Sequence, residues 1–291
     1  MTTESYEFTA RTLLNLGFGE EIAGPLQTKM EQNLAEFTLD HVRKFGKDEM
    51  HSVIYLSKGD KKDYVFVNRY DATLKQEGKE DLTQTFFIGA THNYTLQERY
   101  NMMDGRAVYK EQPFLEKVKD ESAAEKWKPT GETYFAWRAL DFKAADSFGN
   151  FLPKNMFWNH EKEIEKYPIK GIEENYDKQR LIRRLEKGNK VDVILLKEGK
   201  EIPAKMVANP RMMRLDFFDS DGQRMSVRKV TKEEIAQSQK NEMSPQEVQK
   251  AAIARAAEQR PGEAHTQKEG AKEQVAGEQK NAQRRKQGVH I

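Results

Sequence analysis

The chain contains the same short phrase twice, and this repetition constrains the fold more than any other feature. Leu-Asp-Phe at residues 140–142 precedes Asp-Ser-Phe-Gly-Asn at residues 146–150. Leu-Asp-Phe at residues 215–217 precedes Asp-Ser-Asp-Gly-Gln at residues 219–223. Each copy predicts a strand that enters an Asp-Ser-x-Gly turn with an amide side chain behind it. Internal repetition of this kind indicates a fold built from duplicated modules.

Two further segments resemble each other and predict β-hairpins. Residues 52–59 read Ser-Val-Ile-Tyr-Leu-Ser-Lys-Gly, and residues 192–199 read Asp-Val-Ile-Leu-Leu-Lys-Glu-Gly. In both, an apolar run ends at a glycine and a return strand follows, which is typical of a hairpin. Chance similarity is the alternative, because glycine turns beside Val and Ile are common.

Helical segments precede the strands in the same order. The first 30 or so residues predict helices, and residues 96–103 and 177–185 predict two more, each followed by a glycine and a strand. The module is therefore helix, Gly, strand, Gly turn, strand, strand and turn. In the middle copy, a charge-rich insertion separates the first strand from the turn at Gly131. We expect an α+β protein of tandem modules, each a helix plus an antiparallel β-meander.

These patterns divide the chain into four segments. Residues 1–92 hold the N-terminal helices and a first, degenerate module, and residues 93–165 hold the second module with its insertion at 110–129. Residues 166–230 form the third module. From residue 231 to 291 the aromatic residues vanish and Ala, Gln, Glu and Lys dominate, which predicts a helix and then a disordered tail.

The composition excludes several classes of protein. The sequence contains no cysteine, so disulfides, thiol nucleophiles and cysteine-ligated metals are absent. The net charge is only +2, so a basic footprint for nucleic acid would have to be local. The start carries no basic segment followed by an apolar run, and no stretch approaches the roughly 18 apolar residues of a membrane span. We expect a cytoplasmic protein with no membrane partner.

One cluster of basic residues has helical spacing. The candidate phosphate-binding residues are Arg180, Arg183, Arg184, Lys187 and Lys190. Side chains three or four residues apart share one face of a helix, and a cationic face can bind phosphate groups of DNA or RNA. The alternative is an ordinary solvated helix face.

Other motifs are less informative. Residues 62–69 partly match the basic and aromatic strand of RNA-recognition domains, although core packing explains the same alternation. The acidic turn at residues 219–222 begins like a calcium loop but has glycine at the wrong place. His160 and Glu161 lack the second histidine of a zinc motif. We therefore predict no catalytic, cofactor or metal residue, no enzyme activity and no small-molecule substrate.

Four segments together resemble an uncharacterised domain-of-unknown-function family found in Bacteroidota. They lie at residues 16–20, 96–108, 167–170 and 207–210, and the similarity spans roughly residues 13 to 224. Members of that family occur near mobile-element and conjugation genes. The resemblance therefore implies a mobile-DNA context, and it carries no catalytic residue to this chain.

The expected function follows from the basic helix and this context. We expect a non-catalytic accessory protein of a mobile genetic element that binds nucleic acid or a DNA-processing partner. The alternative is a protein-interaction adaptor or inhibitor with no nucleic-acid contact, which the near-zero net charge and the Asp-rich turns favour.

Overall fold

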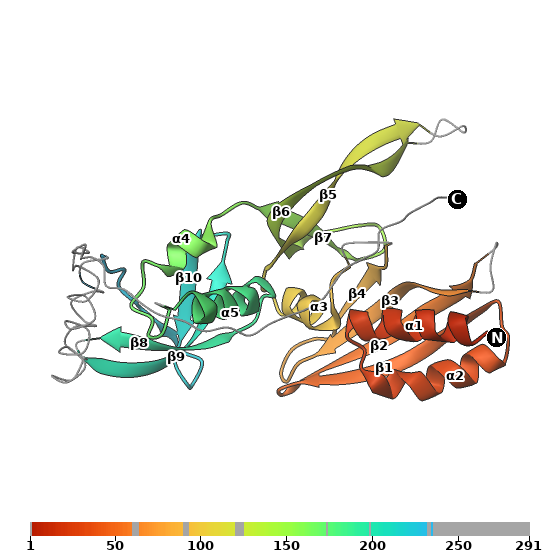
Figure 1. Ribbon diagram of the computed structural model, residues 1–291, viewed down its shortest axis with the longest axis horizontal. Coiled ribbons are helices and arrows are strands. Elements are labelled where there is room, and N and C mark those ends of the chain that lie inside the picture. Colours follow the sequence, from red (N-terminus) through yellow and green to blue (C-terminus); the bar gives the residue numbers. More distant parts are fainter. Residues whose placement is uncertain are drawn as a thin grey trace, which may run out of the picture. The chain divides into compact units, whose positions relative to one another are not determined.

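The computed structural model describes residues 2–59, 64–89, 93–119, 125–172, 174–197, 199–231 and 234. These residues contain five α-helices, one 3₁₀ helix and eleven strands, and every strand pairing is antiparallel (Figure 1). The predicted α+β class is confirmed. The chain divides into two compact units at residue 242, and the described residues all belong to the first. Almost all of the predicted tail at 231–291 lies outside the described residues.

The first sheet is a four-stranded meander preceded by helices. Its elements are α1 (Thr3–Leu16), η1 (Glu20–Ile22), α2 (Ala23–Glu31), β1 (Glu36–Phe45), β2 (Asp48–Lys58), β3 (Val65–Lys75) and β4 (Leu82–Phe87). The predicted N-terminal helices and the β2–β3 hairpin are confirmed. Sequence analysis missed β1, whose alternate side chains Phe37, Leu39 and His41 are buried as expected for a half-buried strand.

The second sheet has three strands and follows α3. Its elements are α3 (Leu96–Met103), β5 (Val108–Lys119), β6 (Glu125–Ala145) and β7 (Phe151–Met156). The charge-rich insertion belongs to a long β5–β6 hairpin. Gly131, predicted to form a turn, instead lies inside β6 with φ 93°, near the register shift between Pro113 and Leu115. Because the bulge at Gly131 keeps β6 continuous, only two strands, β5 and β6, precede the Asp-Ser-x-Gly turn of the second module where the predicted unit has three, and the third strand, β7, follows the turn.

The third sheet is again a four-stranded meander. Its elements are α4 (His160–Ile164), α5 (Asn175–Glu186), β8 (Val191–Lys197), β9 (Lys200–Asn209), β10 (Arg214–Phe218) and β11 (Arg224–Met225). The predicted helix and the β8–β9 hairpin are confirmed. However, β2 has a full strand, β1, on its outer side, whereas β8 lies at the end of its four-stranded sheet and has only an isolated bridge from Ile169 there. The similar hairpins at residues 52–59 and 192–199 therefore differ in what flanks their first strand.

The repeated Asp-Ser-x-Gly phrase forms the same turn twice. Asp146 Oδ1 accepts the backbone N–H groups of Phe148 and Asn150, each at 2.9 Å. Asp219 Oδ1 likewise accepts those of Asp221 at 3.0 Å and of the amide residue behind the turn at 2.8 Å. Because both carboxylates already serve the backbone, the hairpin-turn interpretation is supported over the calcium-loop interpretation.

The second sheet shares its side chains between two hydrophobic cores. Val108 and Leu140 lie in the core beneath the first sheet, where α3 also packs. Their chain neighbours Ala107 and Ala139, together with Trp137, lie in the core of the third sheet and α5. Successive side chains of a strand point to opposite faces, so β5 and β6 serve one core on each side. The described residues therefore form three sheets but only two hydrophobic cores.

Candidate nucleic-acid interface

The basic residues of α5 form one exposed face, as their spacing predicts. Arg180, Arg183 and Arg184 lie on the exposed side of the helix, Lys187 is the exposed residue after it, and Lys190 follows. Ile182 and Leu185 point the other way and are buried against the third sheet. The helix is therefore amphipathic, with a cationic outer side.

The five cations differ in how strongly acids neutralise them. Arg180 lies 3.8 Å from the Asp177 carboxylate, and Lys190 lies 3.6 Å from that of Asp104. The three between them, which we call the cationic triad, are Arg183, Arg184 and Lys187. In the described part of the chain, no carboxylate forms an ion pair with any of the triad. These three charges face solvent and remain available to a phosphate.

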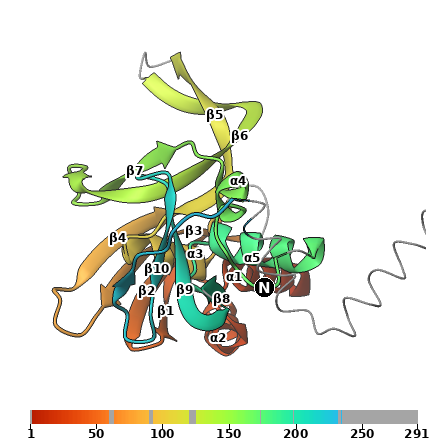
Figure 2. The same ribbon diagram turned by 90° about the vertical axis from the view of Figure 1, so that its left-hand side faces the viewer.

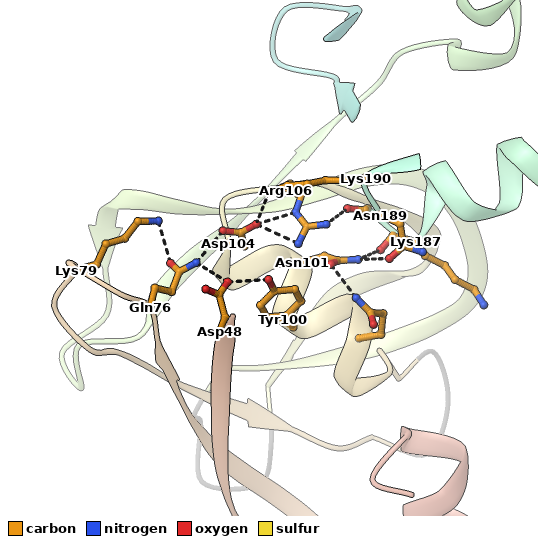
Figure 3. A network of polar contacts seen from close by, with 12 residues as sticks. Asp48, Gln76, Lys79, Tyr100, Asn101, Asp104, Arg106, Lys187, Asn189 and Lys190 are labelled. Atoms are coloured by element: carbon orange, nitrogen blue, oxygen red, sulfur yellow. Dashed lines mark hydrogen bonds and ion pairs between the residues drawn. The ribbon is translucent and has the colours of Figure 1, made fainter. Parts of the chain in front are cut away.

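The C-terminal end of α5 is held by a polar network that starts in the first sheet (Figure 3). Asp48 of β2 accepts the Tyr100 hydroxyl at 2.8 Å and the Gln76 amide at 2.8 Å. Gln76 also donates to Asp104 at 3.1 Å. Asp104 in turn forms an ion pair with Arg106 at 3.1 Å.

From α3 and Arg106, the same network reaches the residues that follow α5. Asn101 donates to the Lys187 carbonyl at 2.5 Å and to the Asn189 side chain at 2.9 Å, and Arg106 donates to the Gly188 carbonyl at 2.7 Å. Helix C-termini leave carbonyl groups unpaired, so these donors satisfy groups that water would otherwise serve. The cationic triad is thus presented by a helix fixed at its end.

Gly188 is required at this junction. Its φ of 75° is left-handed, and a Cβ there would lie 2.8 Å from the Ala107 carbonyl oxygen and 3.1 Å from the Asn101 Cβ. Only glycine accommodates both the conformation and the close approach. The sequence predicted Gly188 as the end of a helix but held no signal for Asn101 or Arg106, which come from a distant segment.

A hollow of about 730 Å³ lies beside the N-terminal half of this cationic face. Arg180 and Arg184 line it together with apolar side chains of β8, such as Val193. Asp177 and Asp219 also line it, so its charge is mixed. The hollow therefore extends the surface next to the triad without making it uniformly basic.

The partial RNA-recognition strand does not present its aromatic residues freely. Residues 62 and 63 lie outside the described residues. Val65 and Val67 are buried, and the ring of Phe66 packs edge-on against Phe8 of α1 at 5.6 Å. The centroid of the Tyr64 ring lies 5.3 Å from that of the same Phe8 ring. These contacts favour the packing interpretation over base stacking.

His160 is buried, not exposed in a cleft. Its Nε2 lies 2.9 Å from the Glu186 carboxylate, and its ring packs between Tyr109 and Trp137 with centroids 4.7 and 4.9 Å away. Ligand atoms of His160, Glu161 and Glu186 lie within 4.8 Å of one another, so these three could hold a metal ion. The contact between His160 Nε2 and Glu186 already pairs two of them, which makes a structural role sufficient to explain the arrangement.

The distal half of the β5–β6 hairpin exposes apolar side chains. Residues 125–133 of β6 pair with β5 alone, and Figures 1 and 2 show the two strands continuing beyond β7. Its exposed side chains include Leu115 at 50% and Trp127 at 61%, and Phe135, nearer to β7 on the same hairpin, is 56% exposed. Exposed apolar side chains on one element can mark an interaction surface.

Searches against protein-family models, curated proteins and solved structures found no match. The resemblance to the Bacteroidota family therefore stays a prediction from the sequence. Among the helices that the structure describes, none is long and apolar enough to cross a membrane.

Proposed function

We propose that this chain binds nucleic acid through the cationic triad of α5. The observation that carries the proposal is three exposed cations, at helical spacing, with no carboxylate partner in the described part of the chain. Four residues of helix span about 6 Å, so Arg183 and Lys187 can reach different phosphates of one strand. Binding of this kind is electrostatic and independent of base sequence.

The helix dipole offers a purely structural explanation of the same residues. Cations near a helix C-terminus stabilise the helix by about 0.3–1 kcal/mol each. That role concerns the stability of the helix alone. It predicts that neutralising the triad lowers thermal stability slightly and leaves any binding of nucleic acid unchanged, so the two explanations can be separated experimentally.

The wider role remains part of the proposal. The chain would act as a non-catalytic accessory protein of a mobile genetic element in the cytoplasm, with a DNA-processing protein as the other candidate partner. This context is supported only by the sequence resemblance.

The test is fluorescence anisotropy with labelled single- and double-stranded DNA and RNA across a salt series, using the full chain. We expect binding that weakens as salt rises. The test variant is Arg183→Gln/Arg184→Gln/Lys187→Gln. Its slope of log affinity against log salt should be shallower by about 0.9 for each phosphate of double-stranded DNA that the triad neutralises in the native chain.

A matched control removes the same charge elsewhere. Lys44, Lys47 and Lys143 are exposed on the other two sheets, and no ion pair forms to them in the described residues. The variant Lys44→Gln/Lys47→Gln/Lys143→Gln should keep most of the affinity. Equal losses of affinity in both triple variants, or no binding by the native chain at low salt, would refute the proposal.

The β5–β6 hairpin favours a second candidate function, a protein-interaction adaptor. Its exposed Trp127 and Phe135 resemble the aromatic anchors that dominate protein interfaces. A photo-crosslinking residue at position 127 would distinguish the two. Nuclease-resistant adducts with a protein would support the adaptor, and adducts that nuclease removes would support nucleic-acid binding.

A further inference from the structure

A second hollow, of about 380 Å³, lies between β4, α3 and the second sheet. Two arginines from different elements line it, Arg99 of α3 and Arg138 of β6. The hollow shares no lining residue with the cationic triad. Its size is at the lower end of the range for small-molecule sites.

Arg99 is a half-buried cation, with its Nε fully buried, and it has no anionic partner among the described residues. Its guanidinium lies over the rings of Phe86 at 4.4 Å and Tyr94 at 4.2 Å, which cover it. Its Nε has no hydrogen-bond partner among the described residues, and the buried Tyr70 hydroxyl lies close enough to interact with the guanidinium. Burial lowers the pKa of Arg99, and the neighbouring Arg138 lowers it further. The guanidinium still stays charged, because the pKa of arginine is so high.

Arg138 is oriented toward the same space by a chain of hydrogen bonds. Its Nη1 donates to Gln112 Oε1 at 2.8 Å, and Gln112 Nε2 donates to the Tyr94 hydroxyl at 2.6 Å. Tyr94 therefore accepts a bond and keeps its own O–H to donate, for which the described residues supply no acceptor. Arg138 also lacks an ion pair within the described part of the chain.

Arg106, which links α3 to the residues after α5, shows for comparison how an arginine with a structural role is paired. Arg106 forms an ion pair with Asp104 at 3.1 Å and donates to the Gly188 carbonyl at 2.7 Å. Within the described residues, Arg99 and Arg138 have no such anion. Asp146 lines the hollow too, but its Oδ1 already accepts backbone N–H groups within its own turn.

Two neighbouring cations without a counter-ion are costly in a partly desolvated space. Aromatic rings offset part of that cost for Arg99. The missing partner is an acceptor with negative charge, and the guanidinium fork matches the oxygens of phosphate and carboxylate groups. We propose that this hollow binds the phosphate or carboxylate group of a small molecule, held by Arg99, Arg138 and the Tyr94 hydroxyl.

The test measures the thermal midpoint of the full chain against increasing inorganic phosphate and, separately, succinate. Sodium chloride at matched ionic strength is the reference. A ligand that binds only the folded state raises the midpoint as its concentration rises. We expect one or both anions to do so beyond chloride. Phosphate alone would assign a phosphate ligand, and succinate alone a carboxylate ligand.

Two variants localise the effect. Arg99→Met keeps the apolar stem of the side chain, and Arg138→Gln removes the second charge at a half-buried position. Each should weaken the anion about tenfold or more, because each removes a charge-assisted hydrogen bond. Without anion, Arg99→Met should be at least as stable as the native chain, because an uncompensated charge has been removed, whereas Arg138→Gln also loses the hydrogen bond to Gln112 Oε1.

The controls separate this hollow from the α5 face. Arg183→Gln should keep the full anion effect, and Arg106→Met should be destabilised, because it removes the 3.1 Å ion pair with Asp104 and the hydrogen bond to the Gly188 carbonyl. An anion effect that persists in Arg99→Met and Arg138→Gln, or that disappears in Arg183→Gln, would overturn the assignment. No effect of either anion on the native chain would overturn it as well, whatever the outcome of the DNA titrations.

Discussion

Replacing Gly188 by alanine tests how α5 is attached to α3. The residue is left-handed at φ 75°, and the new Cβ would lie 2.8 Å from the Ala107 carbonyl oxygen. A left-handed non-glycine residue costs roughly 1–2 kcal/mol. Forcing a methyl group into filled space costs about 1–3 kcal/mol more. A backbone oxygen cannot rotate aside as a side-chain tip can, so Gly188→Ala should lower the free energy of unfolding by about 2–5 kcal/mol.

Gly78→Ala is the matched control for the conformational part. Gly78 has φ 73°, and within the described residues no heavy atom lies within 4 Å of its Cβ position. It should therefore cost only the roughly 1–2 kcal/mol of the backbone conformation. Urea denaturation of the full chain, followed by circular dichroism and tryptophan fluorescence, measures both variants. Equal decreases in stability for Gly188→Ala and Gly78→Ala would refute the close approach of α5 to α3.

Three further predictions concern the turns and the buried histidine. Asn150→Ala should lower the free energy of unfolding by about 0.5–1.5 kcal/mol, because it removes the acceptor of a β4 backbone N–H. The control is Gln223→Ala at the equivalent position, which should change the free energy of unfolding by no more than about 0.5 kcal/mol in the same urea assay. The hydrogen bond from the Asn150 backbone N–H is the main cause that lowers the pKa of Asp146. The ionised Asp146 carboxylate therefore stabilises the folded chain above its ordinary pKa of about 3.9, and this stabilisation is lost as the pH falls through the lowered value. Thermal midpoints between about pH 5 and pH 2 should consequently fall less in Asp146→Asn than in the native chain. Glu186→Ala should cost about 1–3 kcal/mol in thermal denaturation by leaving buried His160 without an acceptor, and Glu186→Gln should cost less.

Local periodicity explains which elements the sequence could predict. The helix predicted at residues 96–103 has the same bounds in the structure, and the helix expected at 177–185 is α5 at Asn175–Glu186. Their ends carry local signals, such as the Thr95 and Glu98 capping box. The exposed face of arginines on α5 follows from the same helical spacing.

The remaining features depend on contacts between distant segments. The charge-rich hairpin resembles an insertion in the sequence, because a two-stranded ribbon exposed on both faces shows little alternation between apolar and polar residues. The Arg99 and Arg138 hollow is invisible in the sequence for a different reason. Neither arginine belongs to a motif, and only the packing of α3 against β6 brings the two charges together.

Both faces of the second sheet contribute to a hydrophobic core, which distinguishes this fold from an open solenoid. In an open solenoid each repeat has an interface like that of its neighbour, so copies can be gained or lost. Here Val108 and Leu140 complete one core, and Ala107 and Trp137 complete the other. Removing the second sheet would therefore expose apolar side chains of both cores at once. The shared sheet makes the stability of the first sheet and that of the third sheet depend on the same two strands.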